Sequence, residues 1–459
     1  MNQKLLTLIK IFIVFLVATL LFFYFKSNTD SEKTETLINN YLVNISFGEK
    51  NGLIKPLLGV NAGPYPSGDE TSVELSKQYK EIGVTSVRTH DFYGPFDMVS
   101  IYPDINADPT NPKSYNFTES DKAFSAIINN GLETYLRIGD SYNKVRIPQN
   151  EKEKNNLIKA MLEVIKRYKN RGQIEYVEIW NEPDLKKFWP EGFEKFIPFY
   201  CDAYNEIKKQ FPDLKVGGPG FVTSTYKIES QRQNVSKFFN YLKERGITPD
   251  FVSFHLYSSD PFDYSNAISF YHEEASKAGF NKIELHLTEW NTEHKDENVD
   301  VILGDKTAPY LTAIWISQQQ AGLNKSFIYR GNDTSTKLPT FFGIFYAEGK
   351  EKPSAKAFKL WSEITKYQNK ILIDVSNYEL NNLWILSGKK TSGEIGILLS
   401  NTGNEEIEYK ISLPVSNEII SGKISEIYNS ETSIKNFDKK ELVFTLKPLS
   451  VQLIELPKL

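Results

Sequence analysis

Cysteine, histidine and blocks of one charge are scarce in this sequence. The 459 residues contain one cysteine, Cys201, which excludes an intramolecular disulfide and a cysteine-rich metal site. No pair among the five histidines has the helical spacing of zinc ligands, so we expect no metal ion and no other cofactor. The net charge of -4 is spread without long runs of one sign, which gives no basic surface for nucleic acid.

Long apolar runs are also rare, apart from one at the amino terminus. Residues 5–25 are apolar except for Lys10 and two threonines, and this length can cross a membrane as a helix. No small-x-small cleavage site follows, so we expect a single-pass membrane anchor over 1–26 and a polar stalk over 27–40. The slight lysine bias places the bulk of the chain on the extracytoplasmic side. A secreted chain whose signal peptide is cleaved is the alternative.

Short apolar runs alternate with amphipathic segments from residue 53 to 367. This pattern is typical of repeated βα units around a parallel sheet, and eight such runs predict a (β/α)8 TIM barrel in the α/β class. The expected strands are Leu57–Ala62, Ser86–His90, Thr134–Ile138, Tyr176–Trp180, Lys215–Gly218, Phe251–Tyr257, Ile283–Glu289 and Ser326–Arg330.

Residues 368–459 follow a different pattern, in which apolar and polar residues alternate. Ile407, Tyr409 and Ile411 show this period of two, which indicates strands, and turn signals separate the runs. We therefore expect an accessory antiparallel β-sandwich. Residues 41–52 begin with the same alternation and are expected to add a strand to it.

Two glutamates each follow a predicted barrel strand. Glu182 ends the fourth strand in Trp180-Asn181-Glu182-Pro183, and Glu289 ends the seventh in Thr288-Glu289-Trp290-Asn291. Catalytic groups of (β/α)8 enzymes lie at the carboxyl ends of the strands, and paired carboxylates there suit hydrolysis of a glycosidic bond. A single such glutamate has an ordinary alternative, an acid that starts a loop. A pair on strands four and seven favours catalysis.

The residues around these glutamates resemble a known clan of retaining glycosidases, with Trp180–Pro183 as the acid/base motif and Thr288–Asn291 as the nucleophile strand. Ser86–Asp91 is similar to the second strand of glycoside hydrolase family 39, which includes β-xylosidases, α-L-iduronidases and exopolysaccharide hydrolases. The resemblance runs from about Tyr41 to the end of the chain, through the stretches Phe342–Phe345, Lys352–Ala355 and Pro448–Val451.

The resemblance implies a role for several residues. Glu289 would form a covalent glycosyl-enzyme while Glu182 acts first as acid and then as base, with net retention. Asn181 would bind the sugar 2-hydroxyl, and Tyr257 would hydrogen-bond Glu289. We expect the charge of Glu289 to raise the pKa of Glu182. The two carboxyl groups are expected about 5 to 5.5 Å apart, the retaining separation.

Strand alternation places further polar side chains at the barrel mouth. Side chains two apart share a face, so Arg88 points the same way as His90, and His255 the same way as Tyr257. Arg88 is expected to lower the pKa of a nearby carboxylate, and a core salt bridge is the alternative. Both histidines are expected to contact sugar or carboxylate. His286 is expected to pack behind its strand.

Aromatic residues near the strand ends have two interpretations, stacking on sugar rings or packing of loops. They are Phe92, Tyr93, Trp189, Trp290 and Tyr329, of which we predict Trp290 and Tyr329 as substrate contacts. The eighth strand ends in Arg330 near a position where many relatives carry tryptophan. An arginine there is compatible with substrates that carry an acidic sugar, as well as with xylosides.

The sequence predicts a membrane-held retaining β-glycoside hydrolase that acts on an oligosaccharide or polysaccharide, either xyloside-like or a surface or exported polymer. The sequence leaves open the sugar and its linkage, whether cleavage is at chain ends or internal, and the oligomeric state. Two alternative functions remain. One is a carbohydrate-binding or scaffold protein that has kept the barrel without turnover, and the other is a transglycosylase that uses the same two acids.

Overall fold

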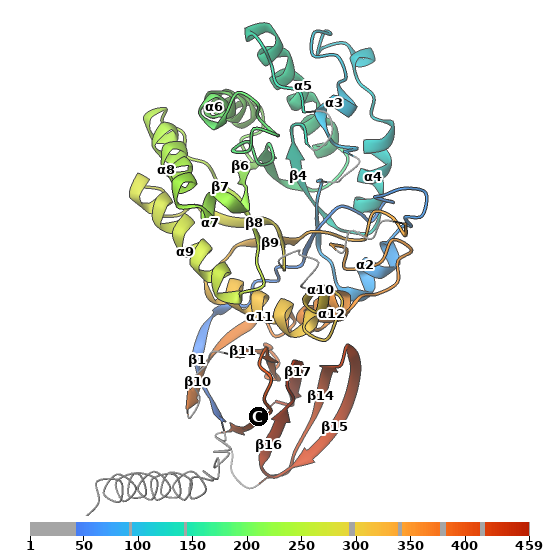
Figure 1. Cartoon of the computed structure of the whole chain (residues 1–459), viewed down its shortest axis with the longest axis vertical. Helices are drawn as coiled ribbons and strands as arrows, with labels where there is room; N and C mark the ends of the chain where they lie inside the picture. Colours follow the sequence, from blue (N-terminus) through green and yellow to red (C-terminus); the bar gives the residue numbers. More distant parts are fainter. Residues whose placement is uncertain are drawn as a thin grey trace, which may run out of the picture.

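A computed structural model of the chain describes residues 43–90, 94–141, 145–292, 299–337, 342–376, 382–413 and 418–458. It contains a closed parallel barrel and a separate nine-stranded sheet, stacked along the long axis of the molecule (Figure 1). Across these ranges, no helix has both the length and the apolar character needed to cross a bilayer. The predicted anchor, residues 5–25, lies outside the described residues.

The barrel is formed by eight parallel strands, and the last of them, β9, pairs back with the first, β2. Each predicted strand overlaps one of them, so the TIM barrel is confirmed. The strands are β2 (Gly59–Asn61), β3 (Ser86–Arg88), β4 (Glu133–Ile138), β5 (Ile174–Ile179), β6 (Lys215–Phe221), β7 (Phe251–Tyr257), β8 (Glu284–Asn291) and β9 (Lys325–Ile328).

Helices surround the barrel (Figure 1). In α5 (Glu151–Lys169), the side chain of Asn150 caps the first turn by accepting from the Glu153 N–H at 3.0 Å, and basic residues fill the last turn. The other longer helices are α2 (Ser76–Ile82), α4 (Thr118–Asn129), α6 (Phe193–Gln210), α8 (Glu229–Glu244), α9 (Pro261–Ala278), α11 (Thr307–Gln320) and α12 (Pro353–Thr365). Short turns of helix are α3 (Met98–Ile101), η1 (Pro112–Ser114), α7 (Thr223–Lys227) and α10 (Val299–Ile302).

The second sheet has the order β15-β14-β17-β12-β11-β10-β1-β13-β16. Its strands are β1 (Val43–Leu53), β10 (Asn369–Ser376), β11 (Leu383–Lys389), β12 (Ile395–Asn401), β13 (Ile407–Ser412), β14 (Ile420–Tyr428), β15 (Glu431–Lys439), β16 (Leu442–Leu446) and β17 (Ser450–Leu456).

One pair in this sheet departs from the expected antiparallel arrangement. β1 is antiparallel to β10, with Asn44 opposite Ser376, but parallel to β13, with Ile45 opposite Ile411. The sheet also folds over on itself, because the Tyr409 hydroxyl of β13 donates to Gln452 Oε1 of β17 at 2.8 Å. Segments from both ends of the chain therefore share one core.

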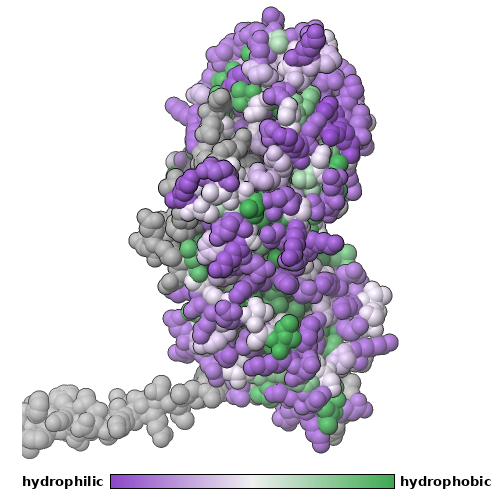
Figure 2. All heavy atoms as spheres, turned by 90° about the vertical axis from the view of Figure 1, so that its right-hand side faces the viewer, coloured by the Kyte–Doolittle hydropathy of each residue, from purple (hydrophilic) through white to green (hydrophobic). Residues whose placement is uncertain are grey.

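Helix α11 lies between the barrel and the sheet (Figure 1). It has no separate polar face, and its residues from Thr307 to Gln319 are buried except for Tyr310, as expected of a helix packed on nearly every side. On the sheet side, the Ser400 hydroxyl donates to the carbonyl of Pro309 at 2.8 Å, and Phe262 of α9 packs on Trp384 with ring centroids 4.8 Å apart. On the outer face shown in Figure 2, hydrophobic side chains form small separate spots among hydrophilic ones.

Candidate active site

The backbone turns sharply where β5 ends. Trp180 and Glu182 have positive φ angles of 78° and 48°, a region that costs a non-glycine residue about 1 to 3 kcal/mol. Two hydrogen bonds hold this turn. The Glu182 N–H donates to the carbonyl of Gly220 at 3.0 Å, and the Trp180 indole donates to the carbonyl of Phe188 at 3.0 Å. The strained turn fixes the position of the Glu182 side chain.

A β-bulge determines which side chains of β8 face the barrel interior. Phe254 of β7 is opposite Leu287, but the next residue, His255, is opposite Glu289, so Thr288 is the extra residue. The Thr288 hydroxyl donates to Glu178 inside the barrel at 2.8 Å, and Glu289 also points inward. Two consecutive residues therefore face the same side.

The bulge shows that two expectations from strand alternation are wrong. Trp290 is not a substrate contact. It is fully buried outside the barrel strands, edge-on to Trp315 at 5.1 Å and to Tyr264 at 5.9 Å. His286 does not pack behind its strand. It lies inside the barrel, stacked on Phe251 at 4.3 Å.

Glu289 is held by three side chains, two from the end of β3 and the residues after it and one from β7, on the far side of the barrel from β3. Arg88 Nη1 donates to Glu289 Oε1 at 2.8 Å, and His90 Nε2 lies 3.2 Å from the same oxygen. The Tyr257 hydroxyl donates to Oε2 at 3.1 Å, which is the contact that the sequence predicted. Burial and the nearby arginines hold the pKa of His90 well below its usual value, so this ring is neutral and can donate from Nε2.

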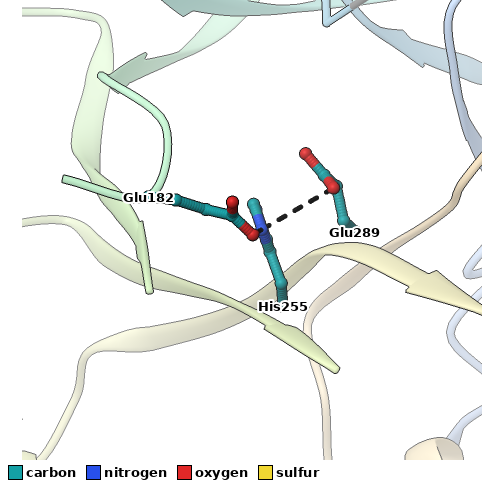
Figure 3. A group of neighbouring side chains, drawn as sticks. All are labelled: Glu182, His255 and Glu289. Atoms are coloured by element: carbon teal, nitrogen blue, oxygen red, sulfur yellow. Dashed lines mark hydrogen bonds and ion pairs between the residues drawn. The ribbon is translucent and has the colours of Figure 1, made fainter. Parts of the chain in front are cut away.

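Glu182 faces Glu289 across His255 (Figure 3). His255 Nδ1 lies 2.8 Å from Glu182 Oε1 and 3.7 Å from Glu289 Oε2. Burial lowers the pKa of His255 to about 4, although the charge of Glu289 opposes the shift, so the ring is neutral near pH 7. Burial also raises the pKa of Glu182 to about 7 against the charges of Arg88 and Lys187. Burial is therefore the main cause of the raised pKa, and the charge of Glu289, which we expected to supply part of it, is not among the causes.

Arg88 is fully buried and hydrogen-bonds several groups of the site. Its Nε donates to Glu178 at 2.6 Å, and its Nη2 donates to Asn181 Oδ1 at 2.8 Å. Burial alone would raise the pKa of Glu178, but the charge of Arg88 and the bond from Ser253 hold it below its usual value. Both interpretations of Arg88 thus apply, because it forms a core salt bridge and also contacts Glu289.

These side chains open into a cavity of about 230 Å³. It is lined by His90, Asn181, Glu182, Phe188, Tyr257, Glu289, Tyr329, Arg330, Thr334 and Phe342. Within its wall, the guanidinium of Arg330 donates to the carbonyl of Ser67 at 2.6 Å. A larger hollow at the opposite end of the barrel surrounds Lys215 and Glu284 and contains no member of this set.

Most of the predicted site residues come together in this cavity. Trp189 is instead buried against Trp180, with centroids 5.0 Å apart, and Phe92 and Tyr93 lie outside the described residues. The sequence reasoning missed Glu178, although a charged residue inside a buried strand was a usable signal. Phe188, Thr334 and Phe342 come from loops, where no periodic pattern marks them.

The site also contains a set of atoms with the chemistry of metal ligands. One donor atom each from Glu182, His255 and Glu289 lie within 4.8 Å of one another. Arg88 places a fixed positive charge 2.8 Å from Glu289, which works against a cation at the same position. The arrangement fits a pair of carboxyl groups that act on a substrate better than metal binding.

Known proteins share sequence and fold with this chain. Residues 61–381 match the model of glycosyl hydrolases family 39. The chain is 24% identical over 258 residues to a β-xylosidase of Geobacillus stearothermophilus, covering 48% of this chain and 49% of the relative. A β-xylosidase of Caldicellulosiruptor saccharolyticus is 23% identical over 239 residues, covering 48% and 46%. The chain thus spans about half the length of the curated relatives it matches.

Solved structures show the same fold. A glucosidase from Croceicoccus marinus superposes with a TM-score of 0.72 at 20% identity, covering 91% of this chain and 99% of that one. A family 39 β-xylosidase from Caulobacter crescentus gives a TM-score of 0.68 at 17% identity, covering 90% and 99%. Because the family model spans the barrel from β2 to beyond β10, the chain belongs to glycosyl hydrolases family 39.

Proposed function

We propose that this protein is a retaining β-glycosidase in which Glu289 is the nucleophile and Glu182 is the acid/base. The observation that carries the proposal is the separation of the two carboxylates. One oxygen of Glu182 lies within 4.8 Å of one oxygen of Glu289. This supports the short spacing of retaining enzymes over the roughly 6.5 to 9.5 Å gap in which inverting enzymes hold a water molecule.

The surroundings of the two acids support opposite protonation states. Glu289 faces Arg88, His90 and Tyr257, all hydrogen-bond donors, which favours its charged form. Burial favours the protonated form of Glu182. Glu289 Oε attacks the anomeric carbon while the bond from this carbon to the leaving oxygen breaks, and the leaving oxygen takes the proton of Glu182. Glu182 then removes a proton from water, whose oxygen displaces Glu289 and returns it as a carboxylate.

The cavity supports removal of single sugars from chain ends. Its volume of about 230 Å³ accommodates one ring, and an internal cut in a polymer requires an open groove. The relatives named as β-xylosidases support a β-xyloside as the first substrate to test. Arg330 in the wall favours a second candidate, a sugar that carries a carboxylate, because arginine binds carboxylates in a bidentate way.

The test uses the chain without residues 1–30 and a panel of aryl β-glycosides that includes a xyloside and a glucuronide. We expect hydrolysis with retained anomeric configuration, followed by NMR, and a loss of about 100- to 10,000-fold in Glu182→Gln and Glu289→Gln. Inverted product, or full activity in either variant, would contradict the assignment. Binding without turnover would favour the scaffold, and transfer to sugar acceptors without hydrolysis would favour a transglycosylase.

We further propose that residues 5–25 hold the enzyme in a membrane with its barrel on the extracytoplasmic side. The support is the length and apolar character of this segment. The full chain should sediment with membranes and resist extraction by high salt, whereas the chain without residues 1–30 should remain in the supernatant. A mature protein that begins after residue 26 would instead identify a cleaved signal peptide.

A further inference from the structure

Glu178 of β5 is a fully buried carboxylate that the double displacement does not use. Burying a charged group costs free energy unless partners compensate for the lost hydration. The partners of Glu178 therefore indicate what it contributes. Its Oε2 accepts from Arg88 Nε at 2.6 Å, and its Oε1 accepts from the Thr288 hydroxyl at 2.8 Å.

Arg88 lies between Glu178 and Glu289. One edge of its guanidinium donates to Glu178, while Nη1 donates to Glu289 at 2.8 Å. Asn61 accepts a second bond from Nη1 at 3.0 Å, and Asn181 accepts from Nη2 at 2.8 Å. Each nitrogen of the planar guanidinium therefore has a fixed partner. Two of these partners, Glu178 and Glu289, are carboxylates, and Glu178 is the one that does not line the cavity.

The other ionisable groups around Glu178 are uncharged near pH 7. They come from β4, β7, β8 and α6, and are Tyr135, His255, His286 and Tyr200. Burial keeps the pKa of both tyrosines well above the usual value and lowers the pKa of each histidine to about 4. On β6, Gly220 has no side chain, and a Cβ at this position would lie 3.5 Å from Glu178 Oε1. One permanent positive charge, Arg88, is thus shared by Glu178 and Glu289.

We propose that Glu178 is a positioning residue that holds the plane of Arg88 and offsets its charge, so that Glu289 stays basic enough to attack. The inference rests on the proposed function. With Glu178 neutral, Arg88 would act on Glu289 alone and overstabilise its carboxylate. A carboxylate stabilised in this way is a weaker nucleophile, and the whole site becomes more positive by one charge.

The test is the pH profile of kcat/KM in Glu178→Gln, which keeps the shape of the side chain and removes its charge. Removing a nearby negative charge favours the ionised form of Glu182. We therefore expect the alkaline limb, set by Glu182, to shift toward lower pH by about one unit, with kcat reduced. An unshifted alkaline limb would overturn the proposal, whatever happens to the rate.

Two matched variants separate charge from structure. Glu284→Gln removes a carboxylate that pairs with Lys215 at 2.7 Å at the opposite end of the barrel, and its limbs should match those of the unmodified protein. Glu178→Asp keeps the charge but shortens the side chain, so kcat should fall while the limbs stay. Glu178→Asp with undiminished kcat would overturn the positioning role, even if Glu178→Gln did not fold.

A measurement without substrate distinguishes this inference from the proposed function. In protein labelled with ¹³C at glutamate side-chain carboxyl groups, NMR titration reports the pKa of Glu182 directly. A lower value in Glu178→Gln supports the inference even where no aryl glycoside is hydrolysed. An unchanged value in a protein that does hydrolyse glycosides overturns it and leaves the proposed function in place.

Discussion

Glu289 accepts hydrogen bonds from Arg88 and Tyr257, whereas in the described part of the chain Glu182 has the imidazole of His255 at hydrogen-bond distance. The two glutamates are chemically identical, so the difference in their behaviour comes from these neighbours and from burial. The same comparison explains why the sequence did not point to Glu178. This residue determines the charge balance at Arg88, but it does not reach the cavity, where catalytic residues are normally sought.

The pH dependence of activity follows from Glu182 at this scale. Its pKa of about 7 lies above the ordinary value for glutamate, so the proton needed by the leaving group is lost as the pH rises through 7. We expect kcat/KM to fall tenfold per pH unit above about pH 7. In Glu182→Gln the amide does not titrate, so the residual activity on an aryl glycoside with a good leaving group should lack this limb. A limb that persists would assign it to another group.

Strand elements were predictable where a run of apolar residues was bounded by turn signals, and this gave every strand of the barrel. The bulge at Thr288 was not predictable, because an extra residue leaves no mark in the composition of β8. It turned Glu289 into the barrel and Trp290 out of it. The parallel pairing of β1 with β13 was also beyond the sequence, since parallel and antiparallel strands on a half-buried face alternate alike.

Strand β6 offers a test of how closely the elements approach at the site. Gly220 has a φ of 69°, and a Cβ there would lie 3.1 Å from His255 Nε2 and 3.5 Å from Glu178 Oε1. Gly220→Ala should lower stability by about 1 to 2 kcal/mol through backbone strain and, by moving His255, reduce kcat by about tenfold or more. Denaturant unfolding and kinetics measure the two effects.

Gly246 is the matched control. Its φ of 66° is nearly the same, but a Cβ there meets nothing within 4 Å. Gly246→Ala should therefore show the same loss of stability with unchanged kcat. Equal kinetic effects in the two variants would mean that strain, and not the contact with His255, is responsible.

At the scale of the whole molecule, helix α11 is buried between the barrel and the sheet, so we expect these two parts to unfold together. Trp384 of β11 packs on Phe262 of α9, and its removal opens the boundary between them. Trp384→Ala should cost about 3 to 5 kcal/mol and lower the Tm of a single calorimetric transition. Phe444→Ala, in the core of the sheet alone, should lower the same transition. Two transitions, of which only one moves in Phe444→Ala, would show that the sheet melts independently.

The place of β1 in the sheet has a consequence for how the chain is made. The ribosome produces β1 before every other described strand, yet its neighbours β10 and β13 follow only after the whole barrel. The barrel strands pair mainly with strands close to them in sequence, so the barrel can assemble during synthesis while β1 waits with both edges open. A chain that stops early would keep those edges exposed and available to other chains or to proteases.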